Sequence, residues 1–116
     1  MTSGDLATRY LTEVSNERDP ERRRKAIEGL FDEAIRYVDQ DGPVDGREAF
    51  IRRIDDLAAL MGPATLFSLK RPAQGVDDLL VFHWQLGTPD DDPVLGGSDV
   101  AIVRNGRITR LYAVLD

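Results

Sequence analysis

The clearest local pattern in the sequence is at its C-terminal end, VLGGSDVAIVRNGRITRLYAVLD, residues 94–116. Two alternating runs, 98–104 and 107–116, flank Asn105 and Gly106, a pair that favours a tight type I′ turn between antiparallel strands. The sequence therefore predicts a β-hairpin here. Asp99 stands at the start of the first strand, immediately before four apolar residues. Its carboxylate either faces solvent at the strand end or points into an apolar interior, where its chemistry changes.

Two further strands are predicted ahead of this hairpin, because the apolar period becomes 2 from Thr65 onward. They are TLFSLKR (65–71) and DLLVFHWQLG (78–87), and the acidic loop TPDDDPVLGG (88–97) follows the second of them. The second strand has two apolar sides, with Leu80, Phe82, Trp84 and Leu86 on one and Leu79, Val81 and His83 on the other.

Three helices are predicted before these strands. The first has an apolar stripe at Leu6, Tyr10 and Val14, which recur every four positions. The second is DPERRRKAIEGLF (19–31), which begins with an N-cap aspartate and a proline at the first helical position. Its basic run, 22–25, is interpreted as a solvated face.

The third helix is predicted to begin at a capping box formed by Asp45 and Glu48 and to end before Gly62 and Pro63. Between the second and third helices, AIRYVDQDGPVDG (34–46) predicts a short strand and a loop. Helices followed by hairpin-linked strands indicate an α+β fold, with the helices on one face of a curved antiparallel sheet.

The composition bounds the function. The chain has 116 residues, which indicates one domain, and it has no cysteine and one histidine, so disulfides are excluded and a histidine-based metal site is disfavoured. A formal net charge of −6 argues against a nucleic-acid partner. No apolar run approaches the ~20 residues of a membrane span, and the first ten residues lack the order of a signal peptide. We therefore expect a soluble, cytoplasmic protein with no membrane partner.

The outer face of the predicted sheet is also apolar. Since only one set of helices is available, that face would expose a large apolar patch in a monomer. The sequence therefore predicts a homodimer that packs sheet to sheet. The expected contact residues are Val81, Val100, Ile102, Tyr112 and Val114.

This order of elements, together with RYL (9–11), YVDQDGPVDGREAF (37–50), FHWQLG (82–87) and SDVAIVRNGRI (98–108), resembles the nuclear-transport-factor-2-like superfamily. The resemblance is in particular to its ketosteroid-isomerase and SnoaL-type polyketide-cyclase branch. It covers nearly the whole chain and implies a single SnoaL-like domain over residues 1–116. The implied architecture is a cone of curved sheet, a cystatin-like α+β barrel, closed by three N-terminal helices around a pocket for a small apolar ligand. The resemblance implies no cofactor.

The resemblance also implies three catalytic residues. Its helix tyrosine falls at Tyr10, its general-base aspartate falls at Asp39, and its protonated aspartate falls at Asp99. Asp41 is a rival for the base, because the loop after Asp39 is short. The epoxide-hydrolase branch matches less well, since Gly97 stands where its arginine would be.

The chemistry of such a set can be stated from the residues. To move a proton beside a carbonyl group, a base removes the proton while hydrogen-bond donors hold the charge that develops on oxygen. A carboxylic acid donates that bond at neutral pH only if burial raises its pKa. Asp99 fills this role if its face of the sheet, shared with Ala101 and Val103, is the concave one. Otherwise Asp99 is a solvent-facing residue of the preceding turn.

The pocket wall is predicted from the apolar residues expected on the concave side, which are Tyr37, Phe50, Ile54, Phe82, Trp84, Ala101 and Leu111. Three functions follow from this arrangement. The first is an isomerase or cyclase that transfers a proton without a metal or cofactor. The second is a non-catalytic module that binds a small apolar molecule. The third is a structural dimer whose pocket is filled by its own aromatic side chains. Converging polar groups in a cavity would distinguish the first from the others.

Overall fold

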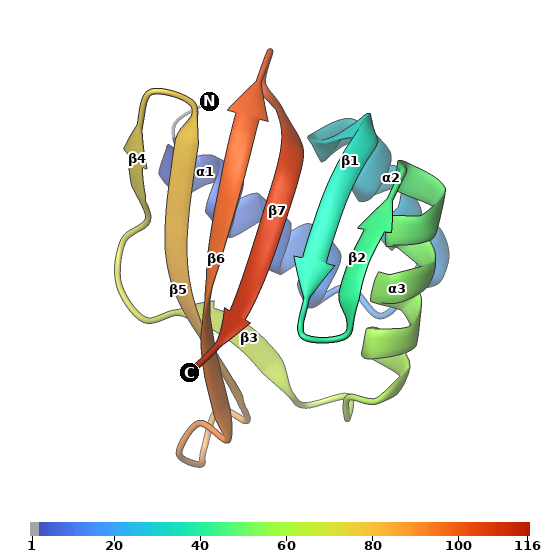
Figure 1. Ribbon diagram of the computed structural model, residues 1–116. Helices are drawn as coiled ribbons and strands as arrows, with labels where there is room; N and C mark the ends of the chain where they lie inside the picture. Colours follow the sequence, from blue (N-terminus) through green and yellow to red (C-terminus); the bar gives the residue numbers. More distant parts are fainter. Residues whose placement is uncertain (1–2) are drawn as a thin grey trace.

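The computed structural model describes residues 3–116 (Figure 1). Helix α1 (Ser3–Tyr10) runs directly into a π-helical turn, η1 (Leu11–Ser15), and helix α2 (Pro20–Leu30) follows. Strands β1 (Phe31–Asp39) and β2 (Gly42–Asp45) pair antiparallel ahead of helix α3 (Arg47–Ala59). The later strands are β3 (Leu66–Leu69), β4 (Gln74–Val76), β5 (Leu79–Gly87), β6 (Leu95–Arg104) and β7 (Arg107–Leu115).

The strands form one curved seven-stranded sheet in the order β2-β1-β7-β6-β5-β3, and β4 pairs with β5 beside β3. Helices α1 and α2 lie behind the sheet in Figure 1, and α3 lies beside β2. The predicted α+β class, with three helices against a curved sheet, is confirmed. The sheet is mixed and open, however, because β1 and β7 pair in parallel. These strands come from distant parts of the chain, so no local pattern specifies the direction of their pairing.

The C-terminal hairpin is confirmed in its details. Asn105 and Gly106 have φ values of 53° and 77°, the positive pair that a type I′ turn requires. Strands β5, β6 and β7 pair antiparallel along almost their whole lengths. Two short strands were not predicted. The segment predicted as a loop after β1 contains the edge strand β2, and β4 is three residues long.

Helix α2 begins as predicted, since the Asp19 side chain accepts a hydrogen bond from the Arg22 backbone N–H. The interpretation of its basic run as wholly solvated is wrong at Arg23, which is 3% exposed. The Arg23 guanidinium donates to Asp55 Oδ1 of α3 from Nε at 3.1 Å and from Nη2 at 2.8 Å. Arg23 is therefore buried because it links the two helices where α2 packs against α3.

The predicted capping box of α3 is wrong. The N-cap residue is Gly46, with φ 93° and no side-chain hydrogen bond, and its N–H donates to the Ile35 carbonyl. Asp45 instead pairs with Arg36 on the neighbouring strand at 3.1 Å, and Glu48 pairs with Arg24 at 2.9 Å. The hairpin thus fixes the start of α3, which a local capping pattern does not show.

The core lies between the concave face of the sheet and the helices. Aromatic rings fill its inner end: Tyr10 packs edge-on against Phe31 and Phe82, with ring centroids 5.6 and 5.9 Å apart, and Phe50 packs between Phe31 and Tyr37. Each of these rings is at most 5% exposed. Among the described residues, no helix is long and apolar enough to cross a membrane.

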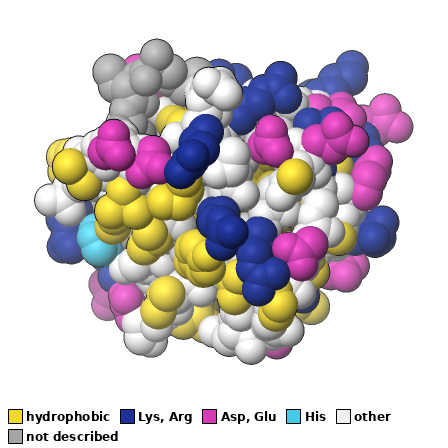
Figure 2. All heavy atoms as spheres, turned by 45° about the horizontal axis from the view of Figure 1, so that its top comes forward, with side chains coloured by type: hydrophobic (Ala, Val, Ile, Leu, Met, Phe, Trp, Pro, Cys, Tyr) yellow, Lys and Arg dark blue, Asp and Glu magenta, His cyan; other side chains and the backbone are white. Residues whose placement is uncertain are grey.

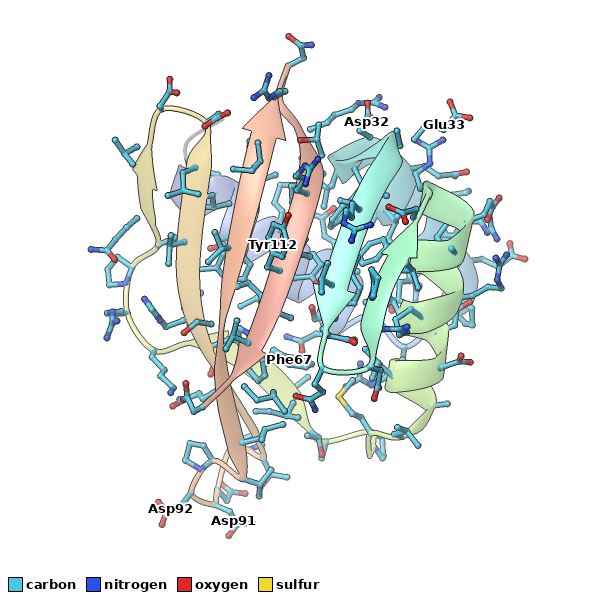
Figure 3. All side chains as sticks on the ribbon, viewed as in Figure 1. Asp32, Glu33, Phe67, Asp91, Asp92 and Tyr112 are labelled. Atoms are coloured by element: carbon cyan, nitrogen blue, oxygen red, sulfur yellow. The ribbon has the colours of Figure 1, made fainter. Side chains whose placement is uncertain are left out.

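The outer face of the sheet carries the apolar residues expected there. Figure 2 shows hydrophobic side chains beside the single histidine, His83, and Figure 3 shows Tyr112 on the outward side of β7. His83 shares a hydrogen bond of 2.8 Å with Ser98 across β5 and β6. Val114 is 58% exposed, and four residues on this face are partly exposed: Val81, Val100, Ile102 and Tyr112.

Candidate functional site

A cavity of about 260 Å³ opens between the concave face of the sheet, η1 and the second half of α3. Apolar side chains make most of its wall, and the polar groups gather on β1, β6 and the end of α1. The lining residues are Tyr10, Leu11, Ser15, Tyr37, Asp39, Gln40, Asp41, Ile54, Leu57, Ala58, Leu60, Met61, Phe67, Trp84, Leu86, Leu95, Asp99, Ala113 and Leu115.

The sheet register brings Asp39 and Asp99 to the same level of the cavity. Asp99 pairs with Ala113 of β7, and on the other side of β7 the register Val38 to Tyr112 places Asp39 beside Ala113 as well. Neighbouring strands are ~4.8 Å apart, so the two aspartates stand ~10 Å apart across one intervening strand. Both side chains belong to the inward-facing set of their strands, and both line the cavity.

Asp99 is buried, so its carboxyl group belongs to the apolar interior and not to the strand end. It is 3% exposed, and its Oδ1 accepts a hydrogen bond of 2.9 Å from Trp84 Nε1. Burial raises the pKa of the Asp99 carboxyl to about 7, although the Trp84 hydrogen bond, which favours the ionised form, acts in the opposite direction. Asp99 therefore keeps its proton at pH values far above those at which an ordinary aspartate loses it.

Two tyrosines lie beside these carboxyl groups. Burial, followed by the charge of Asp99, raises the pKa of Tyr10 above its ordinary value, while a hydrogen bond with Ser15 lowers it. Burial, followed by the neighbouring Tyr10, raises the pKa of Tyr37, which also hydrogen-bonds to Asp39. Both phenols therefore remain protonated donors over the physiological pH range.

Asp39 lies nearer the rim and is held as an ion pair. Its side chain is 11% exposed, and its Oδ1 accepts hydrogen bonds from Arg53 Nη1 at 2.7 Å and from the Asp41 backbone N–H at 2.9 Å. Arg53 comes from α3 and also reaches the Gly42 carbonyl at 3.4 Å. Asp41, the rival for the base, lines the rim with an exposed side chain.

The structure brings six of the ten predicted site residues to the cavity. Tyr10, Asp39 and Asp99 all line it, together with Tyr37, Ile54 and Trp84. The prediction that four others line the wall is wrong, because these residues are fully buried in the core beneath the cavity: Phe50, Phe82, Ala101 and Leu111. Tyr10, which does line the cavity, packs edge-on against Phe82 at 5.9 Å and so lies at the boundary between the cavity and this core.

The outer half of the wall was not predicted. It continues the same patterns toward the mouth: Met61 lies seven residues after Ile54 and two residues past the end of α3, and Leu86 follows Trp84 by two on β5. Phe67 from β3 packs edge-on against Trp84 at 5.1 Å, and Figure 3 labels it at the edge of the sheet. The sequence periodicities show which side these residues take, but they do not show how deep the core reaches.

Metal ligands are not clustered in this site. Within residues 3–116, no group of three His, Cys, Asp or Glu side chains is close enough to hold a metal ion. The two carboxyl groups of the cavity instead contact nitrogen and hydroxyl donors of the protein. The chemistry that this geometry offers from its own residues is hydrogen-bond donation and proton transfer.

The comparison with protein families is decisive for the family. A SnoaL-like domain matches residues 7–111, which is nearly the whole chain. The chain belongs to the SnoaL-like family. The resemblance to SnoaL-type proteins is thereby confirmed. No protein with a curated description matches this SnoaL-like chain.

Solved structures agree with this SnoaL-like assignment. A structure from Agrobacterium tumefaciens, named as a candidate isomerase of the SnoaL-like family, is 33% identical, with a TM-score of 0.89, over 100% of this chain and 99% of that one. A candidate SnoaL-like polyketide cyclase from Jannaschia is 13% identical, with a TM-score of 0.79, over 98% of this chain and 85% of that one. A candidate ketosteroid isomerase from Kribbella flavida is 17% identical, with a TM-score of 0.71, over 98% of this chain and 77% of that one. The last two likenesses show the fold alone.

Proposed function

We propose that this SnoaL-like protein binds a small, neutral, apolar carbonyl compound and catalyses a proton transfer at the carbon next to the carbonyl group. The observation that carries the proposal is the pair of aspartates in one cavity, of which Asp99 is buried, with a pKa of about 7, while Asp39 is ion-paired. Environments that separate two carboxyl groups in this way assign one the part of acid and the other the part of base. The structure from Agrobacterium tumefaciens that is named as a candidate isomerase, 33% identical to this chain, supports the same class of reaction.

Four polar side chains and one backbone N–H have a part in this reaction. The carbonyl oxygen of the ligand accepts hydrogen bonds from the Asp99 carboxylic acid and the Tyr10 hydroxyl, which hold the negative charge that develops there. Asp39 removes the proton from the adjacent carbon and returns it to the same or a neighbouring carbon. Arg53 and the Asp41 N–H both contact Oδ1 of Asp39, so they orient this carboxylate. The apolar wall excludes water and strengthens these interactions.

The size of the cavity limits the ligand. A cavity of ~150 Å³ lined by apolar side chains holds one benzene molecule, which has six non-hydrogen atoms. By the same ratio, a cavity of about 260 Å³ holds about ten such atoms. The proposed ligand therefore buries one or two rings, and a larger compound extends past the exposed Leu60 at the mouth.

Binding of such compounds is expected to raise the melting temperature. A ligand present at about 100 times its dissociation constant stabilises the folded state by ~2.7 kcal/mol if it binds only that state. In a domain of this size that corresponds to a shift on the order of 10 °C. Thermal unfolding should be followed with one-ring and two-ring ketones and with the hydrocarbons of the same skeleton. The ketones should give the larger shifts; a panel without any shift would contradict a ligand of this class.

One observation favours a second function, the non-catalytic binding of the same compounds. The Asp39 carboxylate forms an ion pair with Arg53 at 2.7 Å, so its Oδ1 already has a protein partner. A protein that only binds would keep the cavity and the Asp99 donor and would not need a free base. The two functions differ in one result, because only the enzyme exchanges the proton next to the carbonyl group with solvent.

We also propose that the protein forms a homodimer through the outer face of β5, β6 and β7. Val114→Glu on this face is expected to give a monomer in light scattering at micromolar concentration, because a buried unpaired carboxylate is costly. Val94→Glu is the matched control, since Val94 is 77% exposed in the loop before β6 and its substitution should leave the dimer intact. A wild-type monomer, or a dimer that survives Val114→Glu, would contradict this interface.

A further inference from the structure

Gly97 and Trp84 face each other across β5 and β6, two residues from Asp99 toward the cavity mouth. The register pairs Trp84 with Gly97 and Phe82 with Asp99, so the indole ring extends diagonally over Gly97 to reach the carboxyl group. A Cβ atom at position 97 would lie 2.9 Å from Trp84 Cε2 and 2.7 Å from the Val114 carbonyl oxygen. The indole therefore occupies the space of the missing side chain.

The backbone does not require a glycine at this position. Positive φ values occur at Gly42, Gly46 and Gly106 among the described glycines, and Gly97 is not one of them. Gly97 is therefore needed for space and not for conformation. The backbone carbonyl of Val114 belongs to the adjacent strand, so a side chain at position 97 would displace the indole and would also strain the pairing of β6 with β7.

The indole distinguishes the two oxygens of Asp99. Oδ1 accepts the Trp84 N–H, whereas Oδ2 has no hydrogen-bond partner among the described residues. Oδ2 is not fully buried, and Asp99 lines the cavity, so this oxygen is open to the cavity. An oxygen that accepts an N–H bond is the poorer place for the acid proton, because two hydrogens would then compete for one site. The proton of the carboxylic acid is thus directed to Oδ2.

We propose that Trp84 and Gly97 are positioning residues, which together fix the Asp99 carboxyl group so that its acid proton lies on Oδ2 and points at the ligand oxygen. Trp84 acts through its N–H, and Gly97 acts by leaving room for the ring. Phe67 supports the other side of the indole, with ring centroids 5.1 Å apart. The inference rests on the proposed function for the role of Asp99 as donor, but the positioning itself can be measured in the free protein.

The test uses the single tryptophan, which gives a single indole N–H resonance in an NMR spectrum of ¹⁵N-labelled protein. In the wild type this resonance should shift as Asp99 titrates, with a midpoint near 7. Gly97→Ala should abolish that titration, since the displaced indole no longer contacts the carboxyl group. Asp99→Asn should also abolish it, because an amide does not titrate.

Gly96→Ala is the matched control on the same strand. A Cβ atom there would meet only the ends of two flexible side chains, Asp116 Oδ2 at 2.6 Å and Lys70 Nζ at 2.7 Å, which can move aside. Its indole resonance should titrate as in the wild type. A Gly97→Ala protein that folds and keeps the wild-type titration would overturn the proposal.

A second variant keeps the proposal testable if Gly97→Ala does not fold. Trp84→Phe retains a ring and removes the N–H that favours the ionised form of Asp99. The midpoint of the Asp99 carboxyl ¹³C titration should therefore rise relative to the wild type, and an unchanged midpoint would overturn the role of Trp84. Neither measurement involves a substrate, so the positioning can fail while catalysis stands, and catalysis can fail while the positioning stands.

Discussion

Replacing Asp39 by asparagine should lower the rate of proton transfer ~10²-fold or more, at the lower end of what a positioned general base contributes. The asparagine keeps the size and the Oδ1 acceptor for Arg53, but it cannot take up the proton. Asp99→Asn should keep part of the activity, because the new side chain accepts the Trp84 N–H and presents its amide group as a donor to the ligand. The rate should be measured as the enolisation of a ketone that the thermal assay identifies as a ligand.

Asp41→Asn is the control for this prediction. The Asp41 side chain is exposed at the rim, and its backbone N–H is the group that contacts Asp39. This variant should therefore have nearly the wild-type rate. A large loss in Asp41→Asn together with a small loss in Asp39→Asn would move the base to Asp41. Equal losses in Asp39→Asn and Asp99→Asn would contradict the division of roles.

The second large effect is expected in the pH dependence of folding. The pKa of Asp99 is about 7 in the folded state against an ordinary value of 3.8, so the folded protein prefers the neutral acid. The stability from this group is fully present below about pH 4 and is lost as pH rises to about 7. The free energy of unfolding should fall by roughly 4 kcal/mol over that pH window, since one pKa unit corresponds to about 1.4 kcal/mol.

Asp99→Asn removes this penalty because asparagine stays neutral. Urea unfolding of the two proteins should show that the variant gains roughly 3 kcal/mol relative to the wild type between about pH 5 and about pH 8. Asp78→Asn serves as the control, since Asp78 forms an exposed pair with Arg104 and its substitution should produce no comparable trend. A marked destabilisation of Asp99→Asn at about pH 8 would show that Asp99 is ionised and hydrogen-bonded, and its role as an acid would have to be withdrawn.

The sequence predicts the fold well where local patterns specify it. The Asn105-Gly106 turn, the strand faces around Trp84 and the start of α2 follow from backbone preferences and from the period of apolar residues. The parallel pairing of β1 with β7 joins distant parts of the chain, and its direction is set by the closure of the whole sheet. The start of α3 is set by the preceding hairpin instead of by a capping side chain.

The residues of the site also divide into those that local patterns predict and those that only the tertiary structure shows. Strand alternation gives the side of the sheet for Asp99 and Trp84, and the resemblance supplies Tyr10 and Asp39, so these residues could be named in advance. The depth of each residue along the cone could not be predicted, because it depends on how far the aromatic rings fill the inner end. For this reason Phe82 was placed in the wall although it lies in the core. The contact of Arg53 with Asp39 bridges α3 and β1, and only the tertiary structure shows it.

The most direct test of the proposed function is solvent exchange at the carbon next to the carbonyl group of a bound ketone. The ligand should be incubated in D₂O near neutral pH with the wild-type protein, with and without EDTA, and with Asp39→Asn, and deuterium uptake should be followed by NMR. We expect the wild type to label that carbon faster than buffer does, with no effect of EDTA, and Asp39→Asn to label it ~10²-fold more slowly. A ketone that binds in the cavity and gains deuterium no faster than in buffer would contradict proton transfer and leave the protein as a binding module.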